Sequence, residues 1–180
     1  APMLFNGESV GNGSGPEVDV AVDPVEGTNL LAKGVHNSIA VLGVSGRGTM
    51  FRPGPAFYMD KLVVGPAAAG KVDLDAPVVD NLHAIARAKG MRMEEITVVI
   101  LDRERNADKI DAVRQAGARV RLITDGDVAP ALMTALPGTG VNALMGIGGT
   151  PEGVATACAM RGFGGEIQAR LAPQSDAERE

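Results

Sequence analysis

Two carboxylates and a hydroxyl lie close together in the run Asp-Pro-Val-Glu-Gly-Thr at residues 23–28. Asp23 and Glu26 are three residues apart, directly after an apolar, β-prone segment at residues 18–22, and the proline and glycine of the run favour a rigid turn. Hard divalent cations bind several oxygen ligands around one point, and water activated by such a cation is the usual nucleophile against phosphate esters. The run therefore indicates a cation site, with the Thr28 hydroxyl beside it to orient or help deprotonate a water. The same residues also fit an ordinary polar turn, which Asp23 opens and in which Glu26 is solvated.

Negative charge is concentrated around this run. Residues 1–26 contain five acidic residues and no lysine or arginine. A cation site has this composition before its cation binds, and so does a solvated acidic surface.

Composition restricts the class of protein. With 180 residues, 45% of them hydrophobic, the chain is expected to form one domain or a compact part of a larger one. A net charge of −5, without basic runs that contain aromatics, argues against a nucleic-acid partner. No segment has the length of a transmembrane helix, so we expect no membrane partner. The single cysteine, Cys158, excludes an internal disulfide and fits a reducing compartment such as the cytoplasm, and its small-residue surroundings predict a buried packing role.

Hydrophobic patterning predicts an α/β fold. In the first half, strands are expected at residues 18–22, 38–44 and 58–64, followed by a helix at residues 80–89 that Gly90 ends. In the second half, strands at residues 96–101, 120–124 and 141–147 alternate with helices at residues 106–116, 127–136 and 151–161. Such repeats indicate a parallel sheet covered by helices. We therefore predict a layered α/β (α+β) unit with a mixed-sheet half at residues 1–95 and a parallel β-α-β-α-β-α half at residues 96–180.

The loops after the parallel strands carry polar residues suited to a phosphorylated sugar. Ligands of open parallel sheets bind beyond the carboxyl ends of the strands. The residues at the three ends are, in order, Arg103, Glu104 and Arg105, then Asp125, Gly126 and Asp127, then Gly149 and Glu152. Arginine offers forked donors to phosphate oxygens, and aspartate accepts hydrogen bonds from sugar hydroxyls. Each group also has a structural explanation, namely local ion pairs for the arginines, a turn and a helix cap for the aspartates, and a favourable first-turn charge for Glu152.

The run at residues 23–28 resembles the Asp-Pro-Ile/Val-Asp/Glu-Gly-Thr/Ser signature of the metal-dependent, lithium-sensitive phosphatases, which include inositol monophosphatases and fructose-1,6-bisphosphatases. Four further stretches narrow the resemblance, at residues 1–4, 58–66, 125–128 and 146–154. Over nearly its whole length the chain resembles the class II (GlpX-type) bacterial fructose-1,6-bisphosphatases, some of which also accept sedoheptulose 1,7-bisphosphate.

The resemblance implies a sugar-phosphatase-like fold and a set of roles for named residues. It implies that Asp23, Glu26 and Glu152 ligate Mg²⁺ or Mn²⁺ and that Thr28 positions or activates the attacking water. Glu26, Gly27 and Thr28 would line the 1-phosphate that is cleaved, and Tyr58 with Arg103, Glu104 and Arg105 would hold the distal phosphate. Asp125, Gly126, Asp127 and Gly149 would contact the sugar. The implied reaction is hydrolysis of fructose 1,6-bisphosphate to fructose 6-phosphate in gluconeogenesis or the Calvin cycle, by a cytoplasmic homo-oligomer.

The chain departs from the family pattern in two ways. Family members carry further acidic metal ligands upstream and a long C-terminal stretch, so we expect this chain to be a fragment that starts without an initiator Met. Glu104 also stands where a proline is common, and Asn106 where a histidine is common. Two alternatives stay open: another phosphatase of the superfamily, such as an inositol monophosphatase, or a fragment that binds a metal or a sugar phosphate without catalysis. The arginine loop and Tyr58 favour a bisphosphate, because a monophosphate needs no second anion site.

Overall fold

The structure, a computed structural model, describes residues 7–52 and 54–175. The stretch at residues 1–4 that contributes to the family resemblance lies outside the described residues. The strands are β1 (Val18–Glu26), β2 (Ile39–Gly46), β3 (Tyr58–Val64), β4 (Thr97–Leu101), β5 (Arg119–Ile123), β6 (Ala143–Gly149) and β7 (Glu166–Leu171). The helices are α1 (Thr28–Ala32), α2 (Val78–Lys89), α3 (Ala107–Gln115), α4 (Val128–Met133) and α5 (Thr150–Phe163), with three 3-10 turns at η1 (Pro66–Ala68), η2 (Met93–Glu95) and η3 (Glu104–Asn106). Within the described chain, no helix combines the length and apolar character needed to cross a membrane.

Five strands form one mixed sheet in the order β5-β4-β6-β3-β7. β4 is parallel to both β5 and β6, as the alternating pattern predicts. β3, from the first half of the chain, is antiparallel to β6 on one side and to β7 on the other. The predicted α/β class is confirmed, and the mixed sheet includes strands from both halves. Hydrophobic patterning does not predict β7 or the short helix α1.

Alternation along β3 explains why helices cover both faces of this sheet. Leu62 and Val64 belong to a core cluster with residues of α2 and α3, whereas Val63 packs with residues of α4 and α5. Burying an aliphatic side chain stabilises the fold by about 1.5–3 kcal/mol relative to leaving it exposed. The strand therefore has apolar side chains on both faces, as central strands of helix-covered sheets do.

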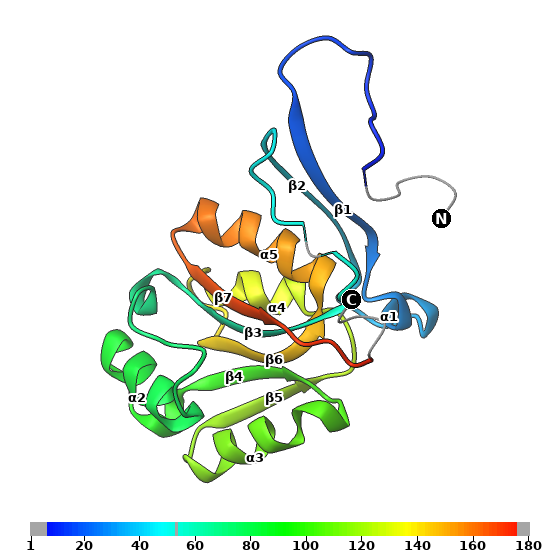
Figure 1. Ribbon diagram of the computed structural model, residues 1–180. Helices are drawn as coiled ribbons and strands as arrows, with labels where there is room; N and C mark the ends of the chain where they lie inside the picture. The colour runs from blue at the N-terminus through cyan, green and yellow to red at the C-terminus, as the bar shows by residue number, and fades with distance from the viewer. Residues whose placement is uncertain (1–6, 53, 176–180) are drawn as a thin grey trace.

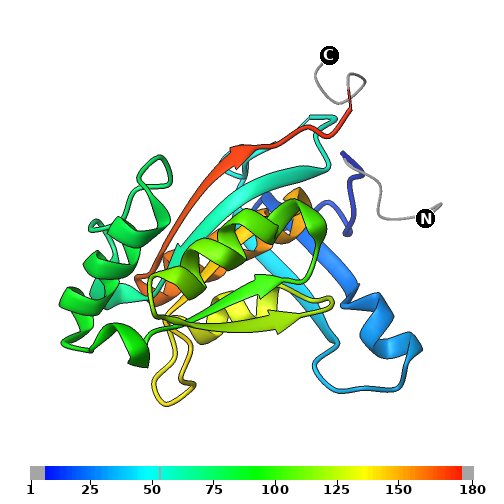
Figure 2. The same cartoon turned by 90° about the horizontal axis from the view of Figure 1, so that it is seen from below.

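β1 and β2 form a separate antiparallel pair that contacts the rest of the chain mainly through α5 (Figures 1 and 2). At this contact, a Cβ added to Gly43 would lie 3.0 Å from Cys158 Sγ, so the strand approaches the helix closely. Cys158 packs against this strand, but the prediction that it is buried is wrong, because it is partly exposed. The opposite face of the pair carries exposed apolar side chains, among them Val20 and Leu42.

One edge of the five-stranded sheet gathers the chain segments that carry the polar residues. Because β4, β5 and β6 are parallel, their carboxyl ends lie at the same edge. β3 runs the opposite way, so its first residue, Tyr58, pairs with Gly149, the last residue of β6. The topology therefore places the amino end of β3 beside the loops that follow the parallel strands.

Candidate functional site

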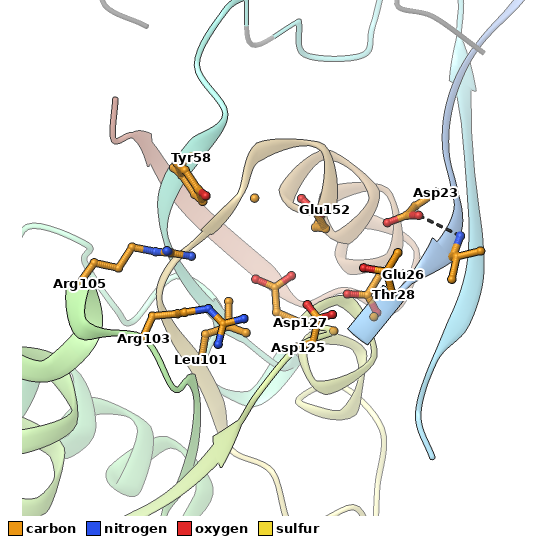
Figure 3. A pocket seen from close by; sticks show the side chains of 14 residues that line it. Asp23, Glu26, Thr28, Tyr58, Leu101, Arg103, Arg105, Asp125, Asp127 and Glu152 are labelled. Carbon is orange, nitrogen blue, oxygen red and sulfur yellow. Dashed lines mark hydrogen bonds between the residues drawn. The ribbon is translucent and has the colours of Figure 1, made fainter. Parts of the chain in front are cut away.

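A pocket of about 320 Å³ opens at this edge. Its lining consists of Asp23, Val25, Glu26, Gly27, Thr28, Tyr58, Leu101, Arg103, Arg105, Asp125, Gly126, Asp127, Gly149 and Glu152. Except for Glu104, every residue proposed for the site from the sequence lines this pocket. Figure 3 shows Asp23, Glu26 and Thr28 on one side, the arginines and Tyr58 on the other, and the aspartates between them.

The acidic run forms the bulged end of a strand, where the sequence predicts that the strand stops at residue 22. β1 continues to Glu26, and between Asp23 and Glu26 it has one residue more than β2 has opposite. A bulge leaves a residue out of the hydrogen-bond ladder and accepts a proline, so Pro24 does not end the strand. The Asp23 carboxylate accepts a hydrogen bond from the amide of Val25 at 3.0 Å (dashed line in Figure 3).

Gly27 connects this strand to α1. Its φ of 81° and ψ of 49° lie in the left-handed region, which glycine adopts without the steric penalty of a side chain. The next residue, Thr28, is then the first residue of α1 and lines the pocket beside Glu26.

Glu26 is a buried carboxylate, with 2% of its surface exposed. Its Oε1 accepts a hydrogen bond from the amide of Val128 at 3.3 Å, and its Oε2 has no hydrogen-bond partner among the described residues. Burial raises the pKa of Glu26 to about 7, with smaller contributions from the nearby charges of Asp127 and Asp23, against the opposing Val128 hydrogen bond. The sequence alternative of a solvated turn residue is therefore wrong for Glu26.

Glu152 occupies the first turn of α5 and is also poorly solvated. Burial raises its pKa, and the Asp127 charge adds to this rise, whereas the charge of Lys61 opposes it. Its Oε2 is buried without a hydrogen-bond partner among the described residues. A Cβ added to Gly149 would overlap this carboxylate, so glycine at that position makes room for it.

The three predicted ligands share one pocket, but they do not form a ready ligand set. Among residues 7–52 and 54–175, no three His, Cys, Asp or Glu side chains are grouped closely enough to hold a metal ion. Mutual repulsion of carboxylates favours such a separation. Even so, buried carboxylate oxygens without a hydrogen-bond donor fit a hard divalent cation. Cation binding by Asp23, Glu26 and Glu152 therefore stays a prediction that the chemistry of the donors supports.

The Asp125-Gly126-Asp127 segment connects the pocket to two other elements. Asp125 Oδ2 accepts a hydrogen bond from the amide of Asn29 at 2.9 Å. Gly126 has a φ of 76°, and a Cβ there would lie 3.3 Å from Glu26 Oε2, so both conformation and space favour glycine. Asp127 precedes α4, but its side chain makes no capping hydrogen bond and pairs with Lys61 instead. The helix-cap alternative for Asp127 is therefore wrong.

The arginines on the opposite side are held by backbone carbonyls and an aromatic ring. Arg105 Nε donates to the carbonyl of Ile147 at 3.2 Å, and its guanidinium lies 4.5 Å from the centre of the Tyr58 ring. Arg103 donates from Nη1 to the carbonyl of Asp102 at 2.9 Å and from Nη2 to that of Thr124 at 2.7 Å. Within the described chain, neither arginine forms an ion pair with Glu104, which begins η3 outside the pocket lining.

Two buried polar residues that sequence reasoning did not assign to the site form hydrogen bonds with the segments that carry its lining residues. Asn106 Nδ2 donates hydrogen bonds to the carbonyls of Leu101 (3.0 Å) and Ile147 (3.3 Å). Its Oδ1 accepts a hydrogen bond from the amide of Ile147 at 2.7 Å. It thereby ties the arginine loop to β6. Lys61 is 2% exposed in the centre of the sheet. A lysine inside the apolar strand Tyr-Met-Asp-Lys-Leu-Val-Val is a visible signal, but the sequence does not indicate its partner.

The pocket lies at one edge of a mixed β-sheet in an α/β fold. Asp23 and Glu26 form its acidic wall, and Arg103, Arg105 and Tyr58 form an arginine–tyrosine wall opposite (Figure 3). This arrangement defines a site suited to a phosphorylated ligand. Comparison with known proteins identifies the family to which this site belongs. The chain belongs to the family described as bacterial fructose-1,6-bisphosphatase, glpX-encoded, whose model matches residues 1–180. The resemblance inferred from the motifs is confirmed.

Curated relatives agree with this assignment. Proteins of Prochlorococcus marinus (strain MIT 9303) and Parasynechococcus marenigrum (strain WH8102) are each 49% identical over 171 residues, which is 95% of this chain and 51% of the relative. Both are named D-fructose 1,6-bisphosphatase class 2/sedoheptulose 1,7-bisphosphatase. The chain therefore spans about half the length of the curated relatives it matches.

Proposed function

We propose that this chain carries most of the substrate site of a divalent-metal-dependent sugar bisphosphatase. The reaction is hydrolysis of the 1-phosphate of fructose 1,6-bisphosphate to fructose 6-phosphate and phosphate, with sedoheptulose 1,7-bisphosphate as a second substrate. The pocket itself is the main support for this proposal. Asp23 and Glu26 face the two arginines across a space that Asp125 and Asp127 line (Figure 3). The names of the relatives support the same two substrates.

The acidic wall is the place for the reacting phosphate. Asp23, Glu26 and Glu152 would hold Mg²⁺ or Mn²⁺, which when bound neutralises phosphate charge and lowers the pKa of a water. Thr28, next to Glu26, offers the hydroxyl that orients this water. Phosphoryl transfer asks a protein mainly for positioning and charge neutralisation, which these side chains provide.

The opposite wall is the place for the phosphate that stays on the sugar. Arg105 lies against Tyr58, an arrangement that fixes the guanidinium plane. A guanidinium donates to phosphate oxygens in a forked geometry, and Arg103 adds a second positive charge. Asp125 and Asp127 lie between the walls (Figure 3), and Gly149 lines the same pocket. Sugar hydroxyls would contact these three residues.

Two charged walls in one pocket favour a bisphosphate over a monophosphate substrate. An inositol monophosphatase has no need of the second anion site, so the arginine wall favours the bisphosphatase. We further propose that the protein acts in the cytoplasm as a homo-oligomer, with small-molecule substrates and neither nucleic acid nor membrane as a partner.

The test is release of phosphate by the protein expressed from its complete reading frame. We expect turnover of fructose 1,6-bisphosphate with Mg²⁺ or Mn²⁺, loss of turnover with EDTA, and little activity on inositol 1-phosphate. Assaying residues 1–180 alone in parallel tests whether this part is catalytic, and calorimetry with fructose 6-phosphate tests whether it binds without catalysis. Equal activity on inositol 1-phosphate, or EDTA-resistant hydrolysis, would refute the proposal.

A further inference from the structure

Lys61 places an ammonium group against two residues of the pocket lining but does not line the pocket itself. Its Nζ donates to Asp127 Oδ2 at 2.5 Å and to the carbonyl of Gly149 at 3.1 Å. The side chains of Lys61 and Asp127 are only 2% and 5% exposed. Both partners line the pocket, so this lysine contacts two candidate sugar-binding residues while remaining outside the lining.

The surrounding backbone holds the ammonium group closely. A Cβ at Gly148 would lie 2.9 Å from Lys61 Nζ and would overlap the Asp127 carboxylate. A Cβ at Gly153 would overlap the Met59 thioether and would be in ordinary contact with Lys61 Cδ at 3.5 Å. Gly148 near the end of β6 therefore lets the backbone approach the Lys61–Asp127 pair closely.

A buried ion pair contributes little net stability to a fold. Removing two charges from water is unfavourable, and apolar residues of similar volume often stabilise a fold as well or better. Here the pair also leaves one carboxylate oxygen without a partner: Asp127 Oδ2 bonds to Lys61, whereas Oδ1 has no hydrogen-bond partner among the described residues. Oδ1 is itself buried, and a buried carboxylate oxygen without a donor is unfavourable, so a ligand hydroxyl would supply the donor that this oxygen still lacks among the described residues.

We propose that Lys61 is a positioning residue for sugar binding, an inference that rests on the proposed function. It holds the Asp127 carboxylate so that Oδ1 accepts a sugar hydroxyl, and it fixes the carbonyl of Gly149, the second candidate sugar contact. Because Lys61 acts through Asp127 and Gly149, its loss should weaken binding of the sugar more than reaction at the phosphate.

The experiment compares Lys61→Met with Lys109→Met in the full-length protein. Methionine keeps the apolar stem of lysine and removes the ammonium group. Lys109 is the matched control, because it pairs at 2.8 Å with Asp60, the neighbour of Lys61 on β3, in a half-buried ion pair outside the pocket lining. The measurements are kcat and KM for fructose 1,6-bisphosphate and for p-nitrophenyl phosphate, together with calorimetric binding of fructose 6-phosphate.

We expect Lys61→Met to raise KM for the sugar bisphosphate, and Kd for fructose 6-phosphate, by about ten- to a hundredfold, since it removes a charged hydrogen-bond partner. The loss in kcat/KM on p-nitrophenyl phosphate should be at least tenfold smaller, and Lys109→Met should change each constant by less than about twofold. Equal losses on both substrates, or an unchanged KM and Kd, would overturn the proposal.

A second variant separates positioning from folding. If Lys61→Met does not fold, the double variant Lys61→Met/Asp127→Asn removes both buried charges and is compared with Asp127→Asn alone. Positioning through Asp127 predicts that the two have equal KM and Kd within about twofold, and a further tenfold loss in the double variant would contradict it. If the wild-type protein binds fructose 6-phosphate but does not hydrolyse the bisphosphate, the proposed function is refuted, and Lys61 is still tested by its effect on Kd. If the wild-type protein neither binds nor hydrolyses, both proposals are overturned.

Discussion

At the scale of single residues, the site depends on carboxylates that the fold keeps away from water. Glu26 is the clearest case, because burial raises its pKa to about 7 from an ordinary value of 4.5. The folded protein therefore binds a proton that the unfolded chain has released between these two pH values. The resulting stability is fully present below pH ~4.5 and is lost as the pH rises through ~7.

We predict that the metal-free protein becomes less stable between pH 5 and pH 8. The contribution of Glu26 is at most about 3 kcal/mol, since one pKa unit corresponds to ~1.4 kcal/mol. The check is urea unfolding in EDTA at both pH values for wild type and Glu26→Gln. Because the Glu152 pKa is raised as well, the difference between the two proteins isolates Glu26, and parallel pH profiles would contradict the prediction.

Thr28 should tolerate serine but not alanine in the full-length enzyme. The hydroxyl is the required part if it orients the attacking water, and such groups contribute ~10²–10⁴-fold. We therefore expect Thr28→Ser to keep most of kcat and Thr28→Ala to lose it. Near-normal turnover by Thr28→Ala would make Thr28 only the first residue of α1.

Arg105 should distinguish sugar bisphosphates from small phosphate esters. Its loss removes one charged hydrogen-bond donor, which costs about 1.5–3 kcal/mol, or roughly ten- to a hundredfold in kcat/KM. We expect Arg105→Ala to show this loss on fructose 1,6-bisphosphate and little change on p-nitrophenyl phosphate. Arg121→Ala, at an exposed position on β5, is the control. Equal losses on both substrates would place Arg105 at the reacting phosphate.

At the scale of elements, loops that carry charges are held by buried polar contacts. Asn106 connects η3, the end of β4 and β6. Asn106→Ala should lower the free energy of unfolding by about 2–3 kcal/mol, because buried backbone groups lose their partners, and should also raise KM for the bisphosphate. Gln115→Ala, at an exposed end of α3, should change stability by less than about 0.5 kcal/mol. Chemical denaturation measures both, and equal stability of the two variants would refute the bracing role.

Elements were predictable where the apolar pattern was local and strong. The parallel strands of the second half read directly as apolar runs, and the polar ends of β4, β5 and β6 could be placed at one edge. β7 could not be predicted, because Glu-Ile-Gln-Ala-Arg-Leu contains good helix formers and becomes a strand by pairing with β3. The bulge at Pro24 was equally hidden, since it depends on the register with β2.

The support of the site was less predictable than its lining. Asp23, Glu26 and Glu152 stand out in the sequence as candidate oxygen ligands, because they lie in recognisable motifs. The partners of Lys61 lie 66 and 88 residues away along the chain, so only the fold brings them together.

At the scale of the whole molecule, folding stability and cation binding should be coupled. A cation that binds only the folded state stabilises it by about 2.7 kcal/mol at a hundred times its Kd. We expect Mn²⁺ or Mg²⁺ to raise the Tm of the wild-type protein. Asp23→Asn should reduce this rise while leaving the metal-free protein equally or slightly more stable, because it removes one charge from an acidic cluster. An unchanged metal-induced rise in Tm would exclude Asp23 as a ligand.

The pairing of β3 has a consequence for how the chain reaches its native state. Tyr58 pairs with Gly149, and Met59 pairs with Leu171. This interior strand can therefore pair only with partners that the ribosome delivers much later, and such high contact order slows folding. During synthesis both edges of β3 stay open, and open apolar edges invite aggregation. The pocket, which needs the Tyr58–Gly149 register, can form only when nearly all of the described chain has emerged.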